Sequence, residues 1–183
     1  RFTRGDRDLR HGDFERLVEA ASSHSVAGCP ILVDEASEPT VSYLIATARR
    51  AIQRHGVRLV VVDYLQLIKG EGRSENRTQQ VGAISRRLKH MAKTLKVPVI
   101  SLAQLNRESE KRDGKRPQLS DLRDSGEIEQ DSDNVVLLHP YESEADVWQV
   151  DLIIAKQRNG PTGTVSLNYR RPVMRFEDYV PRI

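Results

Sequence analysis

The stretch Leu59-Val-Val-Val-Asp63 sets the class of fold that this chain can adopt. It is an uninterrupted apolar run closed by a carboxylate, which is typical of a strand buried on both faces of a parallel sheet. Apolar residues recur at spacings of three and four on either side of it, over residues 41–52 and 81–95, and this period predicts two amphipathic helices. A strand between two helices is the repeating unit of an α/β fold.

Residues that favour helix ends bound both helical segments. Gly56 stands where the first helix is expected to end, and Asn76 and Gln79 stand where the second is expected to begin. Shorter patterns predict a helix over residues 14–21 and strands over residues 31–34, 97–103, 134–138, 149–155 and 164–169. The last two strands are expected to form a hairpin through the Gly- and Pro-containing loop 157–163. We therefore expect one α/β domain over residues 1–183, with a mainly parallel sheet flanked by helices and a C-terminal antiparallel hairpin.

Composition favours a soluble, cytoplasmic protein. The 183 residues carry 29 Lys and Arg against 26 Asp and Glu, a net charge of +3 that permits a nucleic-acid partner without requiring one. Cys29 is the one cysteine in the sequence, which excludes an internal disulfide and a multi-cysteine zinc site, and the five histidines lack metal-ligand spacing. No apolar run approaches the ~18 residues of a membrane span, and the first residues do not resemble a signal peptide.

Polar residues close the predicted strands, and ligands of open α/β sheets bind at the carboxyl ends of strands. Asp63 can orient Mg²⁺ on a nucleotide, although many aspartates at this position only cap a helix. Gln104 closes the next apolar run, so its amide is expected near Asp63, where it can sense a terminal phosphate or the attacking water. Lys156 and Arg158 lie two apart, a spacing that places both on one face of an extended chain. Arginine can clamp charge on phosphoryl oxygens, and a solvated pair is the alternative.

Residues 107–133 show little hydrophobic periodicity and are expected to form a long loop. Loops beyond ~12–15 residues are often functional, and a solvated loop is the alternative. The segment carries six basic and nine acidic residues and no aromatic residue, so it is neither a simple basic patch nor a stacking platform for bases. A phosphate contact there would depend on single arginines and on backbone N–H groups near Gly126.

Five segments of the chain are distinctive when taken together. They are VVVDYLQLI (60–68), ENRTQQVGAISRRLKHMAKTL (75–95), SLAQLNRE (101–108), RPQLSDLRDSGEIEQDSDNVVLLH (116–139) and AKQRNGPTG (155–163). These segments resemble the DnaB-type replicative DNA helicases, and the resemblance runs in order from about residue 1 to about residue 178. DYLQLI, the Gln-Leu-Asn-Arg strand end and SDLRDSGEIEQD are not shared by RecA-like ATPases in general, which argues against a recombinase.

The resemblance implies the RecA-like motor domain of a homo-hexameric ring. Such a ring hydrolyses ATP with Mg²⁺ while it moves along single-stranded DNA at the replication fork, with primase and a helicase loader as further partners. Asp63 matches the aspartate that orients Mg²⁺, and Gln104 matches the phosphate-sensing glutamine.

Two further sets of residues match parts of the family that act on neighbours or on DNA. The basic finger that completes the ATP site of the adjacent subunit is matched by Lys156 and Arg158, with Gln157 beside them. The loop that holds the DNA backbone in the central channel is matched by Arg123, Asp124 and Gly126.

The phosphate loop G-x-x-x-x-G-K-[ST] does not occur in these 183 residues. The resemblance implies that this loop, the first strand, the catalytic glutamate and an N-terminal domain precede Arg1, so we expect a domain that is incomplete at its N-terminus. Without the loop nothing cradles the β- and γ-phosphates, and we predict that this polypeptide alone hydrolyses no ATP. The chain is then part of a longer helicase or a reduced, non-catalytic paralogue that binds DNA or a helicase ring. We expect the former, because the chain starts in mid-domain without a methionine.

Overall fold

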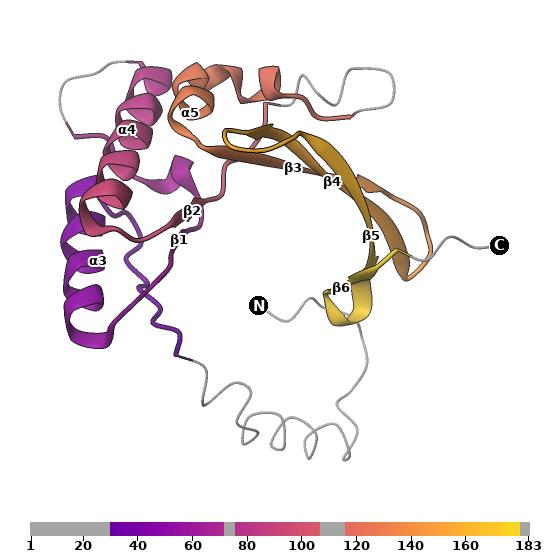
Figure 1. The fold of residues 1–183 in the computed structure, drawn as a ribbon, viewed down its shortest axis with the longest axis horizontal. Helices are drawn as coiled ribbons and strands as arrows, with labels where there is room; N and C mark the ends of the chain where they lie inside the picture. Colours follow the sequence, from indigo (N-terminus) through magenta and orange to yellow (C-terminus); the bar gives the residue numbers. More distant parts are fainter. Residues whose placement is uncertain (1–29, 72–75, 107–115, 180–183) are drawn as a thin grey trace, which may run out of the picture. The chain divides into compact units, whose positions relative to one another are not determined.

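The computed structural model describes residues 30–71, 76–106 and 116–179, and residues 37–183 form one compact unit. Within the described residues, the strands form a two-stranded parallel sheet and a four-stranded antiparallel sheet (Figure 1). The strands are β1 (Val60–Val62) and β2 (Val99–Ser101) in the first sheet, and β3 (Asn134–Tyr141), β4 (Val147–Gln157), β5 (Gly163–Arg170) and β6 (Arg175–Asp178), in that order, in the second. The helices are α3 (Val41–His55), α4 (Arg77–Leu95) and α5 (Gly126–Asp131), with short 3₁₀ turns η1 (Leu65–Leu67), η3 (Leu119–Ser125) and η4 (Arg171–Val173).

The two longer helices begin and end where the sequence predicts. The side chain of Thr40 accepts the N–H of Tyr43 at the start of α3, and that of Asn76 accepts the N–H of Thr78 at the start of α4. These bonds satisfy backbone donors that the first turn of a helix leaves without a partner. Gly56 ends α3 with a φ of 65°, which glycine adopts without the steric cost of a side chain.

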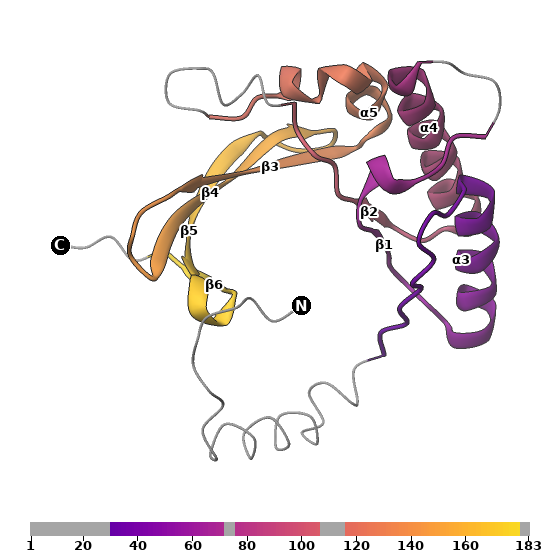
Figure 2. The same cartoon turned by 180° about the vertical axis from the view of Figure 1, so that it is seen from behind.

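The main core lies between these helices and one face of the parallel sheet. Helices α3 and α4 run side by side against β1 and β2, as both views show (Figures 1 and 2). Burying each large apolar side chain stabilises the fold by about 1.5–3 kcal/mol. The apolar residues buried in this core are Val41, Ala48, Val62, Leu65, Ile68, Val81, Ile84, Leu88, Met91 and Ile128.

The expectation that the strand at Leu59–Asp63 is buried on both faces is wrong for the described residues. Val61 is 57% exposed in β1, and Ile100 is 52% exposed in β2. Both side chains lie on the face opposite α3 and α4, because successive residues of a strand point to opposite faces. The described helices cover one face of this sheet, and the β-branched residues on the other face remain accessible to solvent.

The α/β class is confirmed, but the mainly parallel sheet is not, since β1 and β2 are the one pair of parallel strands among the described residues. The short connection 142–146 joins β3 to β4, and it leaves no room for the crossover that parallel neighbours need. The predicted hairpin is confirmed, because β4 and β5 pair antiparallel with Ile154 opposite Gly163.

Two further predictions concern the N-terminal part of the chain. Residues 31–34 do not form the predicted strand, because no described strand pairs with them, and Val33 is 77% exposed. The helix predicted over residues 14–21 and Cys29 lie outside the described residues. Of the helices that the structure describes, none has the length and apolar character needed to cross a membrane.

Candidate functional site

Asp63 lies at the carboxyl end of the parallel sheet. Val62 pairs with Ser101, and the next residue on the second strand, Leu102, donates its N–H to the carbonyl of Val62 at 2.9 Å. The carbonyl of Leu102 in turn accepts the N–H of Leu65 at 2.9 Å, so the segments that follow β1 and β2 leave the sheet side by side. Asp63 is exposed, and its carboxylate makes no hydrogen bond or ion pair with the rest of the described chain. The carboxylate is thus accessible to a ligand.

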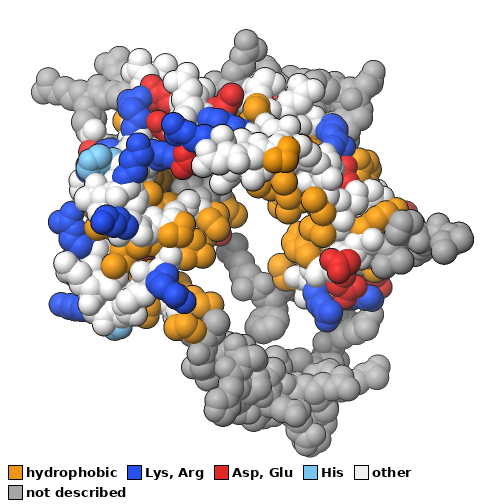
Figure 3. Space-filling view, in the orientation of Figure 1, with side chains coloured by type: hydrophobic (Ala, Val, Ile, Leu, Met, Phe, Trp, Pro, Cys, Tyr) orange, Lys and Arg blue, Asp and Glu red, His pale blue; other side chains and the backbone are white. Residues whose placement is uncertain are grey.

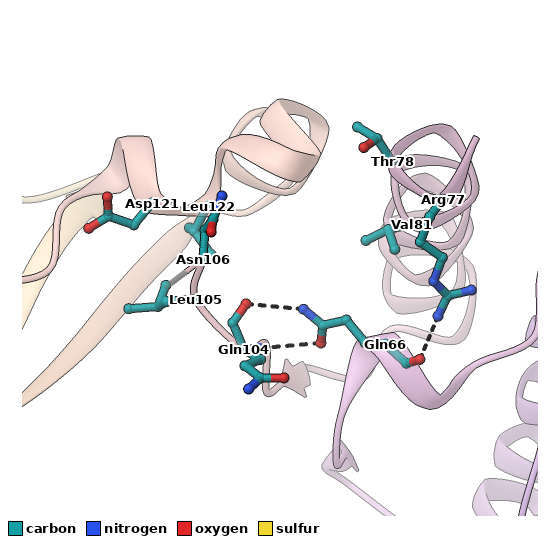
Figure 4. Close-up of a pocket in the computed structure, with 9 residues that line it drawn as sticks. All are labelled: Gln66, Arg77, Thr78, Val81, Gln104, Leu105, Asn106, Asp121 and Leu122. Atoms are coloured by element: carbon teal, nitrogen blue, oxygen red, sulfur yellow. Dashed lines mark hydrogen bonds between the residues drawn. The ribbon is translucent and has the colours of Figure 1, made fainter. Parts of the chain in front are cut away.

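Gln104 leaves the same end of the sheet and is held by a residue to which the sequence analysis assigned no role. The side chain of Gln66 donates to the carbonyl of Gln104 at 3.1 Å and accepts its N–H at 3.3 Å. This pair of bonds fixes the backbone of Gln104, while the Gln104 side chain points away from Leu105 and Asn106 (Figure 4). In the sequence, the one sign of this contact was that Gln66 is a polar residue among the apolar residues of the DYLQLI segment.

A pocket of about 270 Å³ opens beside Gln104, between the start of α4 and η3 (Figure 4). Arg77 donates to the carbonyl of Gln66 at 2.5 Å and to the side-chain oxygen of Gln80 at 3.1 Å. The guanidinium therefore ties the first turn of α4 to η1. The lining residues are Gln66, Arg77, Thr78, Val81, Gln104, Leu105, Asn106, Asp121 and Leu122.

Lys156 and Arg158 lie together at the mouth of the β4–β5 hairpin. The ammonium group of Lys156 donates to the carbonyl of Glu129 in α5 at 2.5 Å. Arg158 donates its N–H to the carbonyl of Asp133 at 2.8 Å and its guanidinium to the Asp133 carboxylate at 3.3 Å. Both basic side chains thus contact one short segment, residues 129–133. Gln157, between them, is exposed.

Asp133 pairs with cations from two elements. Lys89 of α4 contacts one carboxylate oxygen, and Arg158 contacts the other. The hydrogen bond from Lys89, with a smaller contribution from Arg158, holds the pKa of Asp133 below its usual value even though partial burial raises it. Asp133 therefore remains ionised at neutral pH. The sequence offered no sign of this role, because Asp133 is one of nine acidic residues in its segment.

The predicted loop 107–133 is wrong where the structure describes it as helical. Residues 119–131 form η3 and α5, whereas residues 107–115 lie outside the described part. Arg123 and Asp124 lie in η3, and Gly126 is the first residue of α5, so the three predicted DNA contacts follow one another at this junction. Each element spans only about two turns, so an apolar spacing hardly repeats within it. The three-residue spacing of Leu119 and Leu122, which pack against the second sheet, was the available signal.

Arg116 anchors the chain just before η3 on the second sheet. Its guanidinium donates to the buried carboxylate of Asp151 at 2.8 Å. The hydroxyl groups of Tyr141 and Ser166 donate to the same carboxylate at 3.0 and 2.8 Å. Burial alone would raise the pKa of Asp151, but the bonds from Ser166, Arg116 and Tyr141 outweigh it and hold that pKa below its usual value. The start of the η3 segment is therefore fixed by an ion pair between the half-exposed Arg116 and the buried carboxylate of Asp151.

No described group of three or more His, Cys, Asp or Glu residues could hold a metal by itself. A metal at Asp63 would therefore share its coordination with a ligand such as a nucleotide phosphate, which is the usual arrangement for Mg²⁺.

The family model for the DnaB-like helicase C terminal domain matches residues 2–178. The replicative DNA helicase DnaB of Geobacillus stearothermophilus is 47% identical over 169 residues, which is 90% of this chain and 37% of that protein. The replicative DNA helicase DnaC of Bacillus subtilis is 45% identical over 174 residues, which is 92% of this chain and 38% of that protein. The chain thus spans little more than a third of the length of these relatives.

Two solved structures are similar to the chain. The first is an ATPase domain with a TM-score of 0.85 and 37% identity, covering 95% of this chain and 63% of that one. A DnaB-like replicative helicase, solved for its interactions with primase, has the same TM-score and identity, covering 98% of this chain and 44% of that one. With a family model that matches nearly every residue, the chain belongs to the family of DnaB-like helicase C-terminal domains.

Proposed function

We propose that this chain is part of an ATP-dependent replicative DNA helicase that moves along single-stranded DNA as a hexameric ring and unwinds the duplex at the replication fork. The main support is that Asp63 and Gln104 leave the same end of the parallel sheet in a chain matched to the family over residues 2–178. In this proposal, β1 and β2 belong to a RecA-like sheet that residues outside this sequence complete.

Asp63 and Gln104 are assigned to the nucleotide. An exposed carboxylate without a bond to the described chain fits Mg²⁺, which proteins usually bind through one or two carboxylates together with substrate phosphates. When bound, Mg²⁺ and ATP supply the phosphoryl group and the neutralisation of its charge. Asp63 would hold the metal, and Gln104, with its backbone fixed by Gln66, would offer its amide to the terminal phosphate.

Lys156, Gln157 and Arg158 are assigned to the ATP site of the neighbouring subunit. The Arg158 side chain is 66% exposed at the mouth of the hairpin, where a second subunit can reach it. Within the described residues, neither Lys156 nor Arg158 bonds to Asp63 or Gln104. A guanidinium supplied in this way stabilises negative charge that develops on the transferred phosphoryl group.

Arg123, Asp124 and Gly126 are assigned to the DNA backbone. Contacts to phosphates carry no sequence information, which suits a motor that must move over any sequence. We further propose a cytoplasmic location and two additional partners, primase and a helicase loader. Primase is supported by the matched DnaB-like helicase structure, which was solved for its interactions with primase.

Mass spectrometry of the purified protein, first denatured and then native, tests the assembly. A subunit heavier than 20.8 kDa that assembles in sixes and hydrolyses ATP would support the proposal. A subunit of 20.8 kDa that neither assembles nor hydrolyses ATP would favour the alternative, a non-catalytic paralogue or fragment that binds DNA or a helicase. The absence of the phosphate-loop motif from these residues is the observation that keeps this alternative open.

Mixed subunits test the finger in trans. In an ATP-hydrolysing helicase that contains these residues, Asp63→Asn and Arg158→Ala should each abolish hydrolysis, whereas Arg175→Ala, at an exposed arginine of β6, should not. A mixture of the two inactive variants should recover part of the activity, because an intact Asp63 subunit can meet the Arg158 of an Asp63→Asn neighbour. A mixture as inactive as its components would show that Arg158 does not act across the subunit boundary.

A further inference from the structure

The two basic residues of the proposed finger, Lys156 and Arg158, bind residues 129–133, which follow the proposed DNA contacts. Lys156 donates to the carbonyl of Glu129, inside α5. Arg158 donates twice to Asp133, two residues beyond the end of α5. Gly126, the last of the proposed DNA contacts, is the first residue of the same helix. One short element therefore connects a proposed DNA contact to the proposed finger.

The carboxylate of Asp133 contacts a largely buried cation through one oxygen and an exposed cation through the other. Lys89, which contacts one oxygen of Asp133, extends from α4, and its side chain is only 20% exposed. The same helix contributes Ile84 and Leu88 to the core, so this contact is anchored in the packed part of the molecule. Arg158, on the other oxygen, is exposed.

We propose that Asp133 is a positioning residue that couples the DNA-contact segment to the finger, so that DNA binding at η3 and α5 sets the orientation of the Arg158 guanidinium. The inference rests on the proposed function, since it uses the assigned roles of Gly126 and Arg158. Asp133 acts through Arg158 and touches neither DNA nor nucleotide.

The stiffness of α5 supports this coupling. Its six residues span about 9 Å at 1.5 Å per residue, and the N–H of Ser132 donates to the carbonyl of Ile128 at 3.1 Å, which continues the turn to the residue before Asp133. Gly82 of α4 leaves room for the Glu127 side chain of α5, because a Cβ at Gly82 would stand 1.6 Å from a carboxylate oxygen of Glu127. A shift of α5 would move Glu129 directly and would displace Asp133 relative to Lys89, and both residues are bonded to the finger.

The ionisation of Asp133 also fits this role. Its pKa is held down chiefly by the hydrogen bond from Lys89, so the carboxylate keeps its charge throughout the neutral range. A charged acceptor orients a guanidinium more strongly than a neutral one does.

A nuclear magnetic resonance titration of the ¹⁵N-labelled chain with a short single-stranded oligothymidylate tests the proposal. In the wild type, the side-chain Nε–H signal of Arg158 should shift along the same binding curve as the backbone signal of Gly126. In Asp133→Asn, which keeps the size of the side chain, Gly126 should still report binding within about twofold of the wild-type affinity. The Arg158 shift should fall to less than about a third of the wild-type shift. Glu142→Gln, at an exposed carboxylate beside the same sheet, should behave as the wild type does.

The outcomes separate this inference from the proposed function. If the Gly126 signal does not respond to DNA, the proposed DNA contact is wrong and the coupling fails with it. If Gly126 responds while Arg158 of the wild type does not, the DNA contact stands and the coupling is refuted. An Arg158 shift in Asp133→Asn as large as in the wild type would show that Asp133 is not the link. The wild-type titration shows whether DNA binding reaches Arg158 even where the variant folds poorly.

Discussion

Carboxylates in this chain differ in their chemistry because their surroundings differ. Asp63 is exposed and makes no bond to the described residues, which leaves it accessible to a metal and nucleotide. Asp133 pairs with two cations at the surface. Asp151 is buried and accepts hydrogen bonds from three side chains. The sequence shows only an acidic residue at each position, since the partners come from elements far away along the chain.

Glu71 is the carboxylate with the largest pKa shift that the structure resolves. Hydrogen bonds from the side chains of Thr40, Arg87 and Ser42, that of Thr40 first, lower its pKa from 4.5 to about 2. The Glu71 carboxylate joins the start of α3 to α4. Ser42 of α3 donates to it through both its N–H and its hydroxyl, and Arg87 of α4 forms an ion pair with it.

We predict that Glu71→Gln lowers the free energy of unfolding by about 1–3 kcal/mol at pH 7, the usual value for hydrogen bonds to a charged group. Because the folded-state pKa is depressed, this contribution is fully present above pH 4.5 and is lost as the pH falls towards 2. Urea unfolding across this range should show a shallower loss of stability in the variant. Glu38→Gln, in an exposed pair with Lys69, should change stability by less than about 1 kcal/mol.

At the scale of elements, local sequence accounts well for the longer helices and the hairpin. In α4, Val81, Ile84 and Leu88 recur on one face and are buried, as their spacing predicts. Residues 119–131 illustrate the opposite case, because η3 and α5 each span only about two turns and show no repeated apolar spacing. They pack against α4 and the second sheet. Residues 31–34 look like a strand in sequence, but a strand needs a neighbour, and no described strand pairs with them.

The end of α4 offers a test of backbone strain. Lys96 caps the helix in the left-handed region, with a φ of 54°, where a side chain costs about 1 kcal/mol relative to glycine. Lys96→Gly should therefore raise the free energy of unfolding by about 0.5–1 kcal/mol. The matched change Lys93→Gly, inside the last turn of the same helix, should lower it by about 1 kcal/mol. Chemical denaturation of the two variants should show opposite signs, and a loss of stability in both would contradict the assigned strain.

At the scale of the whole molecule, each sheet has a face that no described element covers. Hydrophobic side chains gather over the sides of both sheets that carry no helix (Figure 3). In β3, buried Val135 and Leu137 alternate with Val136 and Leu138, which are 50% and 53% exposed. Exposed apolar surface of this kind is a common site of association.

We predict that the 183-residue polypeptide binds a hydrophobic fluorescent dye in its folded state. Leu138→Lys should reduce the dye fluorescence while it changes the melting temperature little, because the side chain is exposed in the wild type. Val173→Lys, at an exposed residue of η4, is the matched control and should leave the fluorescence nearly unchanged. Equal fluorescence from Leu138→Lys and the wild type would show that the dye binds elsewhere.

ATP hydrolysis is expected to be beyond the capacity of this polypeptide alone. Asp63 and Gln104 are assigned to a metal and a terminal phosphate, but these 183 residues contain no phosphate-loop motif to hold the β- and γ-phosphates. A phosphate-release assay on a preparation of verified mass should give the same rate for the wild type and Asp63→Asn. A faster rate for the wild type that Asp63→Asn abolishes would refute this prediction.

The sequence by itself determined the α/β class, the two longer helices, the hairpin and the resemblance to the helicase family, because these depend on local period, capping and residue motifs. Tertiary structure alone decided which polar groups meet: Gln66 with Gln104, Arg116 with Asp151, and Lys89 and Arg158 with Asp133. It also decided that β1 and β2 are the one pair of parallel strands among the described residues, and that one face of that sheet is exposed. The physical reason is that strand pairing and ion pairing join residues distant in the chain, so their partners depend on how the elements pack.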